Sequence, residues 1–253
     1  MTFQHRAAKP ASTTRLLASV LLSLPMAIYA ASQAPVAAEH GMVVTAQHLA
    51  TQVGVDVLKH GGNAVDAAVA VGYALAVVYP AAGNLGGGGF MTLQLADGRK
   101  TFLDFREKAP LAATANMYLD QQGNVIKGLS TYGHLAVAVP GSVSGLEYAR
   151  EKYGTKKRTE LLRPAIKLAQ YGFTLNQGDL DILQTATDAF RKDTASAALF
   201  LKHGQPWQAG DKLVQKDLAK TLQAISQRGS NGFYQGAVAA AIVRSSQRGG
   251  GII

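Results

Sequence analysis

The segment at residues 64–79, AVDAAVAVGYALAVVY, is apolar on nearly every side when it is placed on a helix. A helix that is apolar all round is buried. This segment is shorter than the roughly 20 residues that cross a bilayer, and it contains Asp66. Its many small side chains allow neighbouring elements to approach closely. The segment therefore predicts a central buried helix with other elements packed around it.

Capping signals precede this helix. Gly61 and Gly62 end an expected helix at residues 46–60, as a left-handed C-terminal cap requires. Asn63 is then a candidate N-cap, and Asp66 three residues later completes a variant of the capping box. Two helices with a tight turn between them are therefore expected.

Strand and turn signals surround the helical pair. A short strand is expected at residues 41–45, and residues 91–95 and 100–105 predict a hairpin around Asp97-Gly98. Irregular structure follows from residue 111. Further helices are expected at residues 141–152, 160–171, 179–190, 216–228 and 237–246. This order predicts a layered α/β sandwich with a helical flank.

The first thirty residues have the organisation of a secretory signal peptide. Three basic residues and no acidic one precede the apolar run LLASVLLSLPMAIYA at residues 16–30. Cleavage is expected after Ala30 or Ser32, with a retained N-terminal anchor as the alternative. Residues 1–30 are thus expected to direct the mature chain, 31–253, to the periplasm or outside the cell, with no stable membrane span after signal removal.

Charge and cysteine content exclude several classes of function. The net charge is +9, but loss of three basic residues with the signal leaves 22 Lys and Arg against 16 Asp and Glu, or +6. The tight basic run Lys156-Lys157-Arg158 lacks interleaved aromatics, so no nucleic-acid partner is expected. Without Cys there is no disulfide scaffold, thiolate zinc site or cysteine nucleophile. No His pair has metal-site spacing, and no metal or cofactor is expected.

The glycine run in AAGNLGGGGF, residues 81–90, is not a phosphate-binding loop. A Walker motif ends in Gly-Lys-Ser/Thr, whereas Phe90 follows Gly89 here. A dinucleotide-binding loop follows a strand and opens a helix, and the order here is the reverse. Taken alone, the run predicts a tight helix-to-strand connection with close backbone packing.

Arg106 lies where the second strand of the hairpin is expected to end. A guanidinium at that position can bind a carboxylate through two parallel hydrogen bonds. The alternative is a structural ion pair with Asp104 or Glu107.

The sequence gives little support for a hydroxyl nucleophile. Ser142 and Ser144 do not fit a nucleophile elbow, which requires Gly two residues before and two after the serine. Thr131 and His134 are three residues apart in a segment without predicted structure. The residues alone therefore indicate a secreted α/β domain with a glycine loop beside a candidate anion-binding arginine.

Longer blocks of the sequence resemble a known family. The run from GMVVTAQHLATQVGVDVLKHGGNAVDAAVA through AAGNLGGGGF to LDFREKAP is similar to the start of the large subunit of the γ-glutamyltranspeptidases. The similarity continues through HLAVAVPGSVSGLEYAREKYGT and GDKLVQKDLAKTLQAI and covers residues 41–251. The resemblance implies an N-terminal-nucleophile hydrolase with a four-layer αββα sandwich, incomplete here, and a helical C-terminal flank.

The resemblance also implies an activity and its partners. Members are precursors that cut themselves into a large and a small subunit. The new N-terminal Thr of the small subunit attacks the γ-glutamyl amide of glutathione and related compounds, with its own α-amine as base and backbone donors for the oxyanion. The γ-glutamyl group then passes to water or to an amino acid or peptide.

Residue by residue, the resemblance assigns Arg106 to the α-carboxylate of the γ-glutamyl group and Glu107 to a bracing role. It makes a supporting scaffold of four glycines, Gly86, Gly87, Gly88 and Gly89. No Thr-Thr/Ser-His block occurs in the sequence, so the nucleophile is expected beyond Ile253. The chain is accordingly expected to be an inactive N-terminal part of the large subunit. The alternatives are a related acylase of the same fold and a non-catalytic periplasmic module that binds a small carboxylate.

Overall fold

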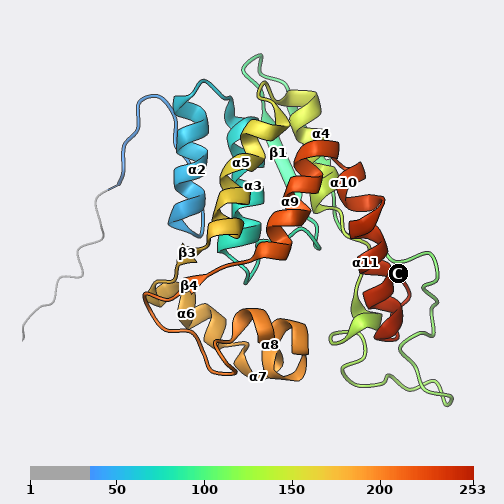
Figure 1. Ribbon diagram of the computed structural model, residues 1–253. Helices are drawn as coiled ribbons and strands as arrows, with labels where there is room; N and C mark the ends of the chain where they lie inside the picture. The colour runs from blue at the N-terminus through green and yellow to red at the C-terminus, as the bar shows by residue number, and fades with distance from the viewer. Residues whose placement is uncertain (1–34) are drawn as a thin grey trace, which may run out of the picture. The chain divides into compact units, whose positions relative to one another are not determined.

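Figure 1 shows the computed structural model, which describes residues 35–253. The predicted signal peptide at residues 1–30 and both expected cleavage sites lie outside the described residues. The helices and strands of the described residues fall within one unit, His40–Ile253. In the described part of the chain, no helix is both long and apolar enough to cross a membrane.

The central helix predicted from the apolar run is α3, Ala64–Val78. It packs against α2 (His48–Lys59), α4 (Ser142–Tyr153) and α5 (Arg158–Tyr171), which surround it in Figure 1. Most of its residues are buried, and Tyr73 is 0% exposed. The helix therefore forms the centre of the hydrophobic core, as its sequence predicts.

The turn between α2 and α3 follows its capping signals. Gly61 has a φ of +77°, and the N–H of Gly62 donates to the carbonyl of Val57 at 2.9 Å, which is the wide bond of a Schellman motif. Asn63 and Asp66 form a capping box in which each side chain accepts from the other's backbone N–H. Both capping predictions are confirmed.

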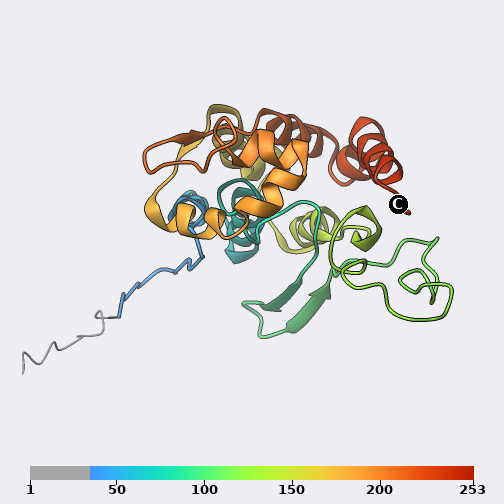
Figure 2. The same ribbon diagram turned by 90° about the horizontal axis from the view of Figure 1, so that it is seen from below.

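One hairpin supplies the strands near the glycine loop. Strand β1 (Phe90–Gln94) pairs antiparallel with β2 (Lys100–Asp104), and Phe90 lies opposite Asp104. Alternate side chains face the helices, and the others are exposed. Figure 2 shows the hairpin as a pair of green arrows beside the helices. The predicted hairpin is confirmed, with shifts of about one residue at the strand ends.

The rest of the described chain is mainly helical. The remaining elements are η2 (His134–Ala136), β3 (Phe173–Thr174), α6 (Gln177–Gln184), α7 (Thr187–Lys192), α8 (Thr194–Phe200), β4 (Lys212–Leu213), α9 (Lys216–Arg228), α10 (Asn231–Tyr234) and α11 (Ala237–Arg248). Strands β3 and β4 pair with each other. Helices around two small antiparallel sheets are consistent with a partial α/β sandwich.

Two predicted elements are wrong. Residues 41–45 form no strand, because they have no strand partner among the described residues. The Thr45 side chain instead hydrogen-bonds to the backbone of Gln47 and leads into α2. The expected helix at 179–190 is broken: α6 ends at Gln184, the Thr185 hydroxyl donates to the Ile182 carbonyl at 2.7 Å, and the chain restarts as α7 at Thr187.

Candidate functional site

A cavity of about 560 Å³ lies where β2 ends, beside the start of α4. Its wall combines the end of the hairpin, the segment before α4, one face of α4 and Tyr234 from α10. The lining residues are Phe102, Leu103, Asp104, Phe105, Arg106, Lys108, Val139, Pro140, Gly141, Ser144, Gly145, Tyr148 and Tyr234. Of the predicted site residues, Arg106 reaches this cavity directly.

The glycine run holds the cavity wall together through its backbone. The carbonyl of Gly87 accepts from the N–H groups of Gly141 at 2.7 Å and Ser142 at 2.9 Å, at the start of α4. A Cβ on Gly88 would lie 2.7 Å from the backbone N of Glu107, closer than packed atoms allow. The loop therefore fastens α4 to the segment that carries Arg106.

The four glycines do not contribute equally. Gly89 exchanges two backbone hydrogen bonds with Phe105 and so extends the hairpin by one pair. Gly87 lies against the side chain of Asn84. A Cβ on Gly86 would meet nothing within 4 Å. A Cβ at 88 would collide with backbone, whereas a Cβ at 87 or 89 would meet the side chains of Asn84 or Phe105, and Gly86 has no steric reason to be glycine.

Arg106 is held at its backbone and one nitrogen but keeps its other donors. Its backbone N–H donates to Asp104 Oδ1 at 2.9 Å, and its Nε donates to Glu107 Oε2 at 3.1 Å. The guanidinium lies 5.9 Å from the centroid of the Phe90 ring. Within residues 35–253 neither Nη group has a partner, and the side chain is 67% exposed. The ion pair with Glu107 thus coexists with two donors that can bind a carboxylate.

Glu107 is fixed as a carboxylate beside Arg106. A hydrogen bond from its own backbone N–H lowers the pKa of Glu107, and the Arg106 side chain and the Gly88 N–H lower it further. The ionised Glu107 orients the guanidinium by accepting from Nε, which leaves the Nη edge directed elsewhere.

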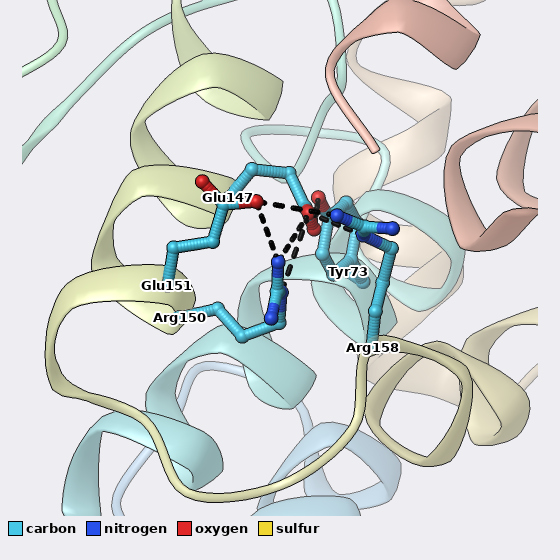
Figure 3. Close-up of polar contacts among 5 residues, drawn as sticks. All are labelled: Tyr73, Glu147, Arg150, Glu151 and Arg158. Carbon is cyan, nitrogen blue, oxygen red and sulfur yellow. Dashed lines mark hydrogen bonds and ion pairs between the residues drawn. The ribbon is translucent and has the colours of Figure 1, made fainter. Parts of the chain in front are cut away.

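A buried charge cluster anchors α4 through side chains that do not line the cavity (Figure 3). Glu147 accepts from the Tyr73 hydroxyl at 3.1 Å with Oε1, and from Arg150 and Arg158 with Oε2. Both arginines also bind Glu151. Burial, with Glu147 adding to it, raises the pKa of Tyr73 well above its ordinary value. The cluster ties α4 to α3 and α5 and so supports the cavity wall.

Neither this cluster nor the role of Tyr234 is predicted from the sequence. The Tyr234 hydroxyl donates to the Pro140 carbonyl at 2.8 Å and accepts from the Ser144 N–H at 3.2 Å, which fixes the turn into α4. The spacing of Glu147, Arg150 and Glu151 indicates helix-surface ion pairs. Nothing in that spacing indicates the partner on α3.

The hydroxyl candidates do not form a nucleophile–base pair. Ser142 donates to Asn84 Oδ1 at 3.3 Å, and Thr131 donates to the Gly128 carbonyl at 3.1 Å. Among the described residues, no histidine hydrogen-bonds to either hydroxyl. Both are structural contacts, and of the residues predicted from the sequence Arg106 is the one that brings available donors to the cavity.

Comparison with known proteins places these features in a family. Residues 50–253 match the gamma-glutamyltranspeptidase family. The chain is 70% identical over 239 residues to the glutathione hydrolase proenzyme of Pseudomonas sp. (strain A14), covering 94% of this chain and 42% of that protein. It is 36% identical over 234 residues to the acylase ACY 1 proenzyme of Pseudomonas sp. (strain SE83), covering 90% of this chain and 42% of that protein.

A solved structure agrees in fold. The gamma-glutamyltranspeptidase of Helicobacter pylori is 51% identical and superposes with a TM-score of 0.85, covering 87% of this chain and 63% of that chain. The present chain spans less than half the length of the two proenzymes named above, since it covers 42% of each. With the family match, the sequence identity and the shared fold together, the chain belongs to the gamma-glutamyltranspeptidase family.

Proposed function

We propose that this chain is the N-terminal part of an exported glutathione hydrolase and γ-glutamyltransferase. Family membership supports the reaction class, and the chain's 42% coverage of a proenzyme supports its place within a longer precursor. The single observation that carries the site is Arg106, whose two Nη groups stay available at a cavity of about 560 Å³.

In this proposal Arg106 binds the α-carboxylate of the γ-glutamyl group, and Glu107 orients Arg106. The nucleophile is a threonine contributed by sequence after Ile253, in the small subunit that self-cleavage of the precursor produces. Glutathione and other γ-glutamyl compounds are the donors, and water, amino acids or peptides receive the γ-glutamyl group. In this proposal the described residues supply binding and scaffold, and the hydroxyls of Thr131 and Ser142 make structural contacts. Export rests on the signal-peptide pattern at residues 1–30.

The test is the steady-state kinetics of Arg106→Ala in the protein that contains this chain together with its small subunit. The KM for γ-glutamyl donors should rise by about 10- to 100-fold, because a charge-assisted contact to a carboxylate contributes roughly 1.5–3 kcal/mol. Arg106→Lys should recover part of the loss, since a lysine keeps the charge but not the two-pronged geometry.

Arg99→Ala is the matched control. Arg99 lies on the same hairpin, is 73% exposed and pairs with its neighbour Asp97, but it does not line the cavity. Its removal should leave KM and kcat within twofold of the wild type. Wild-type kinetics in the Arg106→Ala protein would remove Arg106 from the site.

A second candidate, an acylase of the same fold, is favoured by the similarity to the acylase ACY 1 proenzyme. A panel of donors separates the two functions. Turnover of γ-glutamyl amides over other acyl amides supports the glutathione hydrolase, and the reverse preference supports the acylase. Binding of glutamate without turnover of any amide would support the carboxylate-binding module.

A further inference from the structure

The alternation of strand β2 continues past its last residue. Along residues 101–108 exposed side chains alternate strictly with partly buried ones, and the exposed set is Phe102, Asp104, Arg106 and Lys108. Side chains two residues apart on an extended chain point to the same face, with Cα atoms about 6.6 Å apart. Lys108 therefore stands beside Arg106, and both line the same cavity.

The backbone of Lys108 is fixed. It exchanges two hydrogen bonds with Val139, at 3.1 Å and 2.8 Å, as an isolated antiparallel bridge. Val139 is also part of the cavity wall. The bridge to Val139 thus fixes the backbone position of Lys108 at the edge of the cavity.

The Lys108 ammonium has no counterion in the described part of the chain, where it makes no ion pair and no side-chain hydrogen bond. The other charged residues in the cavity lining are Asp104 and Arg106. Asp104 accepts from the Arg106 backbone, and Glu107 pairs with the Arg106 guanidinium. The cavity therefore contains two cationic groups. The Arg106 guanidinium is paired with Glu107 through Nε, whereas the Lys108 ammonium has no partner among the described residues.

We propose that Lys108 binds a second carboxylate of the donor, the one at the far end of a γ-glutamyl peptide, while Arg106 holds the α-carboxylate. The inference rests on the proposed function and adds to it a preference for donors that carry two carboxylates. A lysine suits this role because its ammonium is a compact charge on a flexible stem, which can follow the far end of a flexible peptide. Arg106, fixed by Glu107, sets the position of the near end.

The experiment compares two donors in the complete protein. Glutathione carries a carboxylate at each end, whereas a γ-glutamyl anilide carries only the α-carboxylate. In Lys108→Gln the ratio of the glutathione KM to the anilide KM should rise about fivefold, the effect of one solvent-exposed charge pair. Lys108→Arg should restore the ratio, and added salt should shrink the wild-type advantage for glutathione because it screens exposed charges.

Lys100→Gln is the control, since Lys100 is exposed on β2 but does not line the cavity. Its KM ratio should equal that of the wild type. An unchanged ratio in Lys108→Gln, or an equal rise in both KM values, would overturn the role of Lys108 and leave Arg106 unaffected. A wild-type protein that turns over neither donor would instead overturn the proposed function, and the role of Lys108 with it.

Discussion

At the scale of single residues, Asp66 links parts of the chain that are far apart in sequence. Its carboxylate is 0% exposed and accepts from the Asn63 N–H at 2.9 Å, the Thr155 hydroxyl at 2.7 Å and the Lys156 N–H at 3.0 Å. Burial would raise the pKa of Asp66, but these hydrogen bonds outweigh burial and lower it. One side chain thus caps α3 and fixes the loop that leads into α5.

Asp66→Asn should lower the free energy of unfolding by about 3 kcal/mol, because the amide has a single acceptor and turns donors toward N–H groups. The wild-type contribution is present above the ordinary aspartate pKa and is lost as the pH falls through the lowered pKa of Asp66. Urea unfolding of the wild type and Asp66→Asn at neutral and acidic pH tests this prediction. The difference between their free energies of unfolding should be smaller at acidic pH.

Asp56→Asn is the control for this substitution. Asp56 is exposed on α2 and accepts from Gln52 one turn away, so the change should stay within about 0.5 kcal/mol. Equal losses in the two variants would contradict the bridging role of Asp66.

Spacing in the sequence predicts only the local contacts of Asp66. The capping box with Asn63 is local, so three residues of spacing suffice to find it. Thr155 lies 89 residues away, and only the packing of α4 against α3 brings it to the carboxylate. The Arg106–Glu107 pair is local in the same way, whereas Tyr234 reaches the cavity wall through long-range packing.

At the scale of elements, helices were easier to predict than strands. Helix α9 occupies the predicted residues 216–228, because its apolar positions recur with the helical period. Residues 41–45 have a strand-like pattern, but a strand also requires a partner, which the pattern does not specify. Strands β3 and β4 are two residues long and form only by mutual pairing, too short for any pattern.

The glycine loop gives a prediction at this scale. Gly88→Ala should lower the free energy of unfolding by about 1–3 kcal/mol, because the new methyl group would press on the backbone between Phe105 and Glu107. Gly86→Ala should be neutral or slightly stabilising, since its Cβ would meet nothing and alanine restricts the unfolded chain. Urea unfolding of both variants measures this difference. Equal changes in the free energy of unfolding for Gly88→Ala and Gly86→Ala would contradict the prediction.

At the scale of the whole molecule, the cluster around Glu147 joins the three helices α3, α4 and α5. Removing one partner from a buried ionic cluster leaves the others unpaired, which is more damaging than losing an exposed ion pair. Tyr73 is its deepest member, and its hydroxyl donates to Glu147. Since its pKa is raised in the folded protein, folding favours the protonated form of Tyr73.

The pKa of Tyr73 is raised in the folded state. The stabilisation from its protonated hydroxyl is therefore complete below the ordinary tyrosine pKa of about 10. This stabilisation is lost as the pH rises through the raised pKa. Tyr73→Phe should lower the free energy of unfolding by about 1–3 kcal/mol at neutral pH. The variant should also lose less stability than the wild type between neutral and strongly alkaline pH. Denaturant unfolding across that range measures both effects.

Tyr132→Phe is the matched control, because Tyr132 is 77% exposed. It should follow the wild type at every pH. A Tyr73→Phe protein with the same alkaline loss as the wild type would contradict a raised pKa of Tyr73 in the folded protein.

The bridge between Lys108 and Val139 closes a long irregular loop at its base, and the turn at Gly123 lies exposed near the middle of that loop. Loop-closure entropy grows only with the logarithm of length, so doubling such a loop costs about 0.6 kcal/mol. Because the bridge fixes both ends of the loop, the geometry of the cavity wall depends little on how many residues the loop contains. An insertion at the Gly123 turn is therefore expected to leave Arg106 and Lys108 in register, so a fluorescent or affinity label placed there should report on the protein without disturbing the site.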